Sequence, residues 1–192
     1  MTASDRTKQL LAEGIKEMSA EMPFRKIRVG ALCQRSGIDR RTFYYHFRDI
    51  YDLAAWIFNQ TVDVCLPDER GRFPYRAMVQ VLRQLERDAG FYRSALAEDS
   101  QNALGRHIMD HIVELYEKAY LKQRGAPATE KEAFAIRYHS VGSLTMLRRW
   151  LIADCMMPPE KMAMMLICAM PGMLMVLFDL EGMPEKGEND AG

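Results

Sequence analysis

The amino-acid sequence predicts an almost entirely α-helical (all-α) protein. Apolar residues recur at three- and four-residue spacing along the chain, and no segment alternates apolar and polar residues as a half-buried strand does. Proline, glycine and capping residues punctuate this pattern at intervals typical of globular helices. With 192 residues and 48% hydrophobic content, the chain can bury a substantial core.

A first helix is expected to begin near Ser4, a residue suited to an N-cap, and to stop at Pro23, which cannot continue a helix. Leu11, Ile15 and Met18 are spaced so that they fall on one face of this helix. That face can pack against the elements that follow.

Two short helices are expected next, over residues 29–35 and 40–46. Gly37 lies between them and can take the left-handed conformation that often ends a helix. Asp39 can then accept hydrogen bonds from the free N–H groups of the next helix. Two helices joined by such a turn form a helix-turn-helix.

Asp49 is expected to cap a fourth helix, which ends before a loop at residues 66–74. The apolar spacing predicts further helices over residues 75–87, 91–97, 102–123, 130–153 and 159–180. The polar, glycine-containing end predicts a disordered tail. We therefore expect a helix-turn-helix head at residues 1–48, a larger helical body at residues 49–180, and a tail at residues 181–192.

The formal net charge is zero, yet the positive charge is concentrated near the N-terminus. Between Phe24 and Arg48 there is a single acid, Asp39, against these bases: Arg25, Lys26, Arg28, Arg35, Arg40, Arg41 and Arg48. An anionic partner would therefore be met in this region.

The segment GIDRRTFYYHF, residues 37–47, gathers arginines and aromatic residues on one short helix. Phe43 and Phe47 share a face on which they can pack inward. At about 100° per residue, the remaining side chains point elsewhere, with Arg41, Tyr45 and Arg48 nearly opposite Phe43. Guanidinium and hydroxyl groups bind phosphates and base edges, so this helix is suited to the DNA major groove. A solvated basic face is the alternative.

The segment KIRVGALCQRSGIDRRTFYYHFRDIYDL, residues 26–53, resembles the DNA-binding signature of the TetR family of bacterial transcription regulators. The matching positions are Val29, Leu32, Ser36, Gly37, Ile38, Thr42, Phe43, Tyr44, His46 and Phe47. The resemblance implies a homodimer whose head, residues 1–48, binds a double-stranded, pseudopalindromic DNA operator. Its body, residues 49–180, would dimerise and, as in many members, bind a small-molecule effector. Repression is the expected output.

By the same resemblance, some residues would contact bases and others phosphates. The base-contacting positions are Arg40, Arg41 and Tyr44, and the phosphate-contacting positions are Thr42, Tyr45, His46 and Arg48. Arg28 replaces the threonine that usually caps the second helix, and it adds a cation able to reach a phosphate. Arg41 stands where the family often has glycine.

The remainder of the chain is similar to the C-terminal domain of a TetR branch that includes regulators of dihydroxyacetone kinase operons. This similarity implies dimerisation through the last two helices. An effector pocket would open between body helices, and we expect it to be lined by residues that are equally good core residues: Phe73, Met78, Phe91, Tyr92, Met109, Tyr116, Tyr138 and Met146.

Other classes of protein are less consistent with the sequence. The uncharged run at residues 162–178 approaches the length of a membrane span, so a tail-anchored or peripheral membrane helical protein is the alternative. His107 and His111 have a spacing compatible with metal ligation, but no third ligand follows, and we expect no metal or cofactor. No enzyme signature is present, and four scattered cysteines are consistent with a cytoplasmic location.

Overall fold

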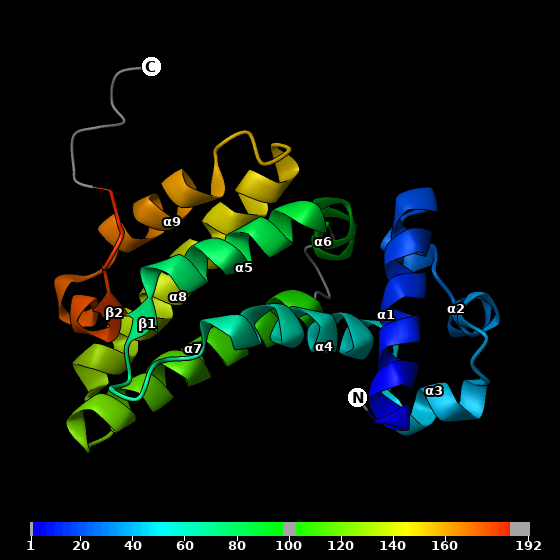
Figure 1. Ribbon diagram of the computed structural model, residues 1–192, viewed down its shortest axis with the longest axis horizontal. Helices are drawn as coiled ribbons and strands as arrows, with labels where there is room; N and C mark the ends of the chain where they lie inside the picture. The colour runs from blue at the N-terminus through cyan, green and yellow to red at the C-terminus, as the bar shows by residue number, and fades with distance from the viewer. Residues whose placement is uncertain (1, 98–102, 185–192) are drawn as a thin grey trace. The chain divides into compact units, whose positions relative to one another are not determined.

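The computed structural model describes residues 2–97 and 103–184 and confirms the all-α prediction (Figure 1). The α-helices are α1 (Ala3–Glu21), α2 (Val29–Ser36), α3 (Arg40–His46), α4 (Ile50–Val62), α5 (Tyr75–Arg87), α6 (Ala89–Leu96), α7 (Ala103–Arg124), α8 (Glu130–Ile152) and α9 (Pro159–Cys168). Three 3₁₀ helices, η1 (Phe24–Lys26), η2 (Asp63–Cys65) and η3 (Gly172–Leu177), and two short strands, β1 (Phe73–Pro74) and β2 (Phe178–Asp179), complete the described chain.

The start of α1 differs from the expectation at Ser4. Thr2 is the N-cap, because its hydroxyl accepts from the Asp5 amide at 3.1 Å while the Asp5 carboxylate accepts from the Thr2 amide at 2.9 Å. This reciprocal capping box satisfies two otherwise free donors, whereas Ser4 lies within the first turn.

The described residues form two compact units. One comprises the described residues of 1–60 and 88–108, and the other comprises Thr61–Arg87 and the described residues of 109–192. In the first unit α6 packs on α1 and η1, and the side chains of Lys16 and Asp88 form an ion pair at 2.6 Å. The division into a head at residues 1–48 and a body at residues 49–180 stays a prediction.

The expected final helix over residues 159–180 begins at Pro159 as predicted, but its predicted end is wrong, because α9 ends at Cys168. Pro171 has no amide hydrogen to donate, and its ring disfavours helical geometry at the residue before it. The chain therefore turns at Pro171 into η3 and then into β2. Strand β2 pairs in parallel with β1, so that Phe178 lies beside Phe73 (Figure 1).

The segment after α9 is fastened to α7 by hydrogen bonds from side chains to its backbone. The Tyr120 hydroxyl donates to the Met173 carbonyl at 2.7 Å, and the Gln123 amide group donates to the Val176 carbonyl at 2.8 Å. Leu174 and Leu177 are fully buried beneath these contacts. The segment is thus a packed part of the second unit.

In the described part of the chain, no helix combines the length and the apolar character that a bilayer span requires. The run at residues 162–178 is divided among the end of α9, a turn at residues 169–171, η3 and the first residue of β2. Of the predicted tail, residues 185–192 lie outside the described residues.

Candidate nucleic-acid interface

The turn between α2 and α3 has the geometry that the sequence predicts. Gly37 has a φ of 66°, in the left-handed region, and its amide and that of Ile38 return to carbonyls at the end of α2. A side chain at position 37 would be strained, because L-residues other than glycine seldom adopt this conformation. The turn ends α2 and directs the chain into α3.

Asp39 begins α3 as its N-cap. Its carboxylate accepts from the Thr42 amide at 2.9 Å and from the Thr42 hydroxyl at 2.6 Å. These hydrogen bonds hold the pKa of Asp39 below its usual value of 3.8. The ionised cap fixes the first turn of a helix that is too short to form alone.

The inner face of α3 is apolar and packed. Phe43 is fully buried and Phe47 nearly so, and their ring centroids are 5.9 Å apart. Phe47 also contacts the Trp56 ring of α4 at 6.0 Å. These rings anchor α3 to its own unit and determine which of its residues face away.

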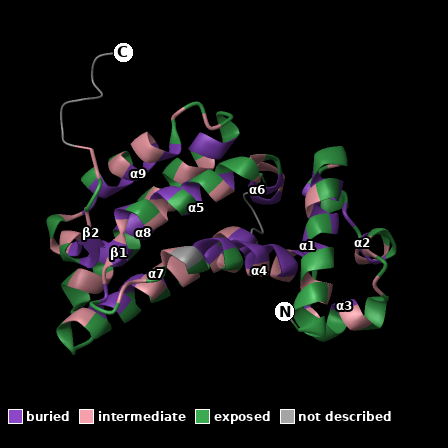
Figure 2. Ribbon diagram, viewed as in Figure 1, coloured by how far each residue is buried: buried purple, intermediate pink, exposed green. Residues whose placement is uncertain are grey.

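The outer face of α3 is exposed along most of its length (Figure 2). Arg40 and Arg41 are exposed, Tyr44 is 51% exposed and Tyr45 is 82% exposed. Two guanidinium groups and two phenol hydroxyls therefore point out of the same short helix. Such a surface can form bidentate hydrogen bonds with guanine and donate to phosphate oxygens.

Thr42 and His46 lie half-buried on the flank of α3. The Thr42 hydroxyl donates to the Asp39 carboxylate at 2.6 Å, so a phosphate oxygen would have to replace Asp39 as the acceptor of this proton. The His46 ring contacts the Tyr45 ring at 4.9 Å in an edge-on arrangement. Both predicted phosphate ligands are thus held by neighbours on their own helix.

Arg48 is paired in the structure with an acid that the sequence analysis did not single out. Asp52 accepts from the Arg48 amide at 2.9 Å, and its carboxylate lies 3.4 Å from the Arg48 Nε. This contact raises the pKa of Arg48. The spacing of four residues between opposite charges is the signal that could have identified the pair.

Two further basic residues of the head have different environments. Arg28 is exposed at the N-cap position of α2 and makes no side-chain cap, as expected for a residue that replaces a capping threonine. Arg35 donates from both terminal nitrogens to the Glu21 carboxylate, at 2.6 Å and 2.7 Å. Arg35 is one of the basic residues between Phe24 and Arg48, yet its ion pair joins α2 to α1.

The eight predicted effector-pocket residues are divided between the two compact units. Phe91 and Tyr92 belong to the first unit, where Phe91 packs on Phe24. In the second unit, the rings of Phe73, Tyr116 and Phe178 pack together, with centroids 5.4–6.1 Å apart. The other four are Met78 and Met109, which are half-buried, and Tyr138 and Met146, which are exposed and line a groove on α8.

The two histidines of α7 have different surroundings. The His107 Nε2 lies 3.2 Å from the Asn59 side-chain oxygen, and His111 is half-buried. Over the described ranges, no group of three or more metal-binding side chains converges.

A short capped helix that is anchored inward by phenylalanines and presents arginines and tyrosines outward defines a helix-turn-helix protein. A family model described as "Transcriptional regulator C-terminal region" (TetR_C_8) matches residues 74–172, just over half of the chain. The chain belongs to the TetR family of transcriptional regulators.

One curated relative is the HTH-type dhaKLM operon transcriptional activator DhaS of Lactococcus lactis subsp. lactis (strain IL1403). It is 25% identical over 94 residues, which cover 48% of this chain and 50% of the relative, so the match spans about half the length of that protein. A solved structure titled "Dihydroxyacetone kinase operon activator DhaS" superposes with a TM-score of 0.64 at 19% identity, covering 90% of this chain and 98% of the other. At this identity the superposition supports the fold.

Proposed function

We propose that this protein is a sequence-specific DNA-binding regulator that binds a pseudopalindromic operator as a homodimer, with α3 in the major groove. The observation that carries the proposal is the outer face of α3, where Arg40, Arg41, Tyr44 and Tyr45 are all exposed. Their exposure is not incidental, because Phe43 and Phe47 fix the helix by its opposite face.

The proposed contacts divide into two groups. Arg40, Arg41 and Tyr44 contact base edges and so carry sequence preference. The second group orients the head on the DNA backbone, and it comprises Arg28, Thr42, Tyr45, His46 and Arg48. When a phosphate approaches, the Arg48 guanidinium either leaves Asp52 or binds the phosphate and the Asp52 carboxylate together.

Homodimerisation through α8 and α9 is supported by large apolar side chains that are exposed on these helices. They are Phe134, Tyr138, Val141, Met146 and Ile152 on α8, and Met165 on α9. Contiguous exposed apolar surface is typical of protein–protein interfaces. A dimer fixes the spacing of two α3 helices and hence of two operator half-sites.

Regulation is proposed to follow from a shift between conformations. A small-molecule effector that binds the body only when the two heads are wrongly spaced would lower operator affinity and release the DNA. Repression is the proposed output, whereas the relative is named as an activator. Expression of a reporter gene placed behind the operator distinguishes repression from activation. Such a regulator would act in the cytoplasm.

Selection of bound duplexes from a random pool tests the proposal and identifies the operator. We expect an enriched motif of two inverted half-sites. Recovery of unenriched sequences, with protein that is folded and dimeric, would refute sequence-specific binding.

A further inference from the structure

Gly142 lies near the middle of α8, and no packing contact within the described part of the chain requires a glycine there. It is exposed, and a Cβ atom built on it would meet no described atom within 4 Å. Glycine within a helix lowers helix stability relative to alanine. The missing side chain therefore points to something that approaches α8 from outside.

Large apolar side chains surround Gly142 on the exposed face of α8. Tyr138 is 70% exposed and Met146 is 47% exposed, four residues before and after the glycine. Phe134 continues the face, and its ring stacks on that of Tyr138 with an interplanar angle of 14°. Gly142 is thus a low point between bulky neighbours, which would admit the backbone of another helix.

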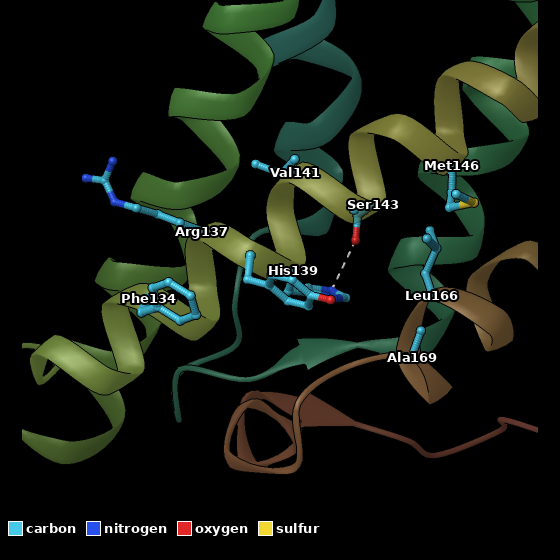
Figure 3. Close-up of a pocket in the computed structure, with 10 residues that line it drawn as sticks. Phe134, Arg137, His139, Val141, Ser143, Met146, Leu166 and Ala169 are labelled. Atoms are coloured by element: carbon cyan, nitrogen blue, oxygen red, sulfur yellow. Dashed lines mark hydrogen bonds between the residues drawn. The ribbon is translucent and has the colours of Figure 1, made fainter.

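A groove of about 580 Å³ adjoins this low point, between α8 and α9 (Figure 3). Leu166 of α9 and Ala169, the C-cap residue that follows it, form one side of the groove. His139 and Ser143 lie on the α8 side, with the His139 Nε2 3.2 Å from the Ser143 hydroxyl. The low point and the groove form one continuous, mainly apolar surface.

We infer that α8 of a second copy crosses α8 antiparallel at Gly142, so that the dimer's two-fold axis passes beside this residue. The inference rests on the proposed dimer and assigns the place where its two halves meet. The second copy's apolar side chains next to its own Gly142 would then fill the adjoining groove.

The charge pattern of α8 favours a second copy of this chain as the occupant. A two-fold axis brings each residue beside it close to its own counterpart, so charges there would repel. Residues 138–147 contain no Asp, Glu, Lys or Arg. His139 is buried, which lowers its pKa to about 4 and leaves it neutral at pH 7.

Complementary groups also lie on the two sides of Gly142. Exposed Phe134 precedes it by eight positions, and exposed Arg149 follows it by seven. In an antiparallel crossing, Phe134 of one copy therefore comes opposite Arg149 of the other. A guanidinium group over an aromatic ring is attractive, so the face is self-complementary.

Gly142→Ala tests the crossing, and Gly90→Ala is the matched control. Gly90 is also exposed on a helix, and a Cβ atom there would likewise meet no described atom within 4 Å. By sedimentation equilibrium, we expect Gly142→Ala to raise the dimer dissociation constant about tenfold, the low end of the cost of forcing a methyl group into a packed contact. Gly90→Ala should leave the constant unchanged.

A cross-link provides a second readout. In a Cys155→Ser, Cys168→Ser background, Gly142→Cys should form a disulfide-linked dimer under mild oxidation, because a disulfide requires closely spaced Cα atoms. Gly90→Cys in the same background should stay uncross-linked.

The outcomes separate this inference from the proposed function. If the wild type is a dimer that selects a DNA motif, yet Gly142→Ala raises the melting temperature without weakening the dimer, the crossing is wrong and the function stands. Absence of the Gly142→Cys cross-link in such a dimer also overturns the crossing. A monomeric wild type that selects no motif overturns both.

Discussion

Phe43 and Arg41 are two residues apart on α3, and their side chains have opposite roles. Phe43 is fully buried, and Arg41 is exposed. Helical spacing alone predicts this division, because Phe43 and Phe47 share one face and the arginines lie on the other. The sequence could not show the partners of individual charges, such as Glu21 for Arg35 across two helices.

Arg41→Ala should change the sequence preference of the protein. The loss of a good base contact costs about 1–3 kcal/mol of binding free energy and relaxes one position of the motif. Repeating the duplex selection with the variant measures the effect. An unchanged motif would remove Arg41 from the base contacts.

Arg48→Ala should instead weaken binding to all sequences. A phosphate contact carries no sequence information, and its loss lowers the slope of log affinity against log salt by about one. Arg35→Gln is the matched control, since its guanidinium is committed to Glu21. If both variants alter the slope equally, the assignment of Arg48 to a phosphate is wrong.

Asp39→Ala should lower the thermal midpoint at pH 7, because the carboxylate caps α3. The pKa of Asp39 in the folded state lies below 3.8. The ionised carboxylate therefore contributes its full stabilisation above that pH, and this stabilisation is lost as the pH falls through the folded-state pKa. The difference between wild type and variant should therefore narrow below pH 3.8. Asp39→Asn, whose side-chain oxygen can still cap α3, should lower the thermal midpoint at pH 7 by less than Asp39→Ala does.

At the scale of elements, α2, α3, α5 and α8 begin where their sequence signals predict. Local signals account for two of these starts, because Asp39 caps α3 and Thr129 and Glu132 form a reciprocal capping box on α8, whereas Gly37 marks the end of α2. The predicted end of the last helix, at residue 180, is wrong because Pro171 breaks the helix within a run whose apolar content alone favours its continuation. The pairing of β1 with β2 joins residues about 100 positions apart, for which local patterns carry no signal.

Phe178→Ala tests whether this pairing stabilises the second unit. Phe178 is buried and packs on Phe73 and Tyr116, so its truncation should cost about 3 kcal/mol of unfolding free energy. Val176→Ala, at a position that is 47% exposed, should change it by less than about 0.5 kcal/mol. Urea titrations compare the two variants. Equal, small effects would show that β2 contributes little.

At the scale of the whole molecule, the order of elements along the chain does not match the compact units. Helix α6 follows α5 of the second unit in sequence, yet it packs with the first unit. The Phe24 amide donates to the Ser94 hydroxyl at 2.9 Å, and the Lys16–Asp88 ion pair reinforces the contact. Because these partners are about 70 residues apart, sequence periodicity could not predict them.

The central claim is that two copies of α3, held at a fixed separation by one dimer, enter successive major grooves on one side of a duplex. The most direct test measures the affinity of the dimer for the selected operator and for the same operator with about 5 base pairs, half a helical turn, inserted between its half-sites. We predict a large loss of affinity, to that of a single half-site, because the second half-site rotates to the opposite side of the duplex. Undiminished affinity for the lengthened operator would contradict the account.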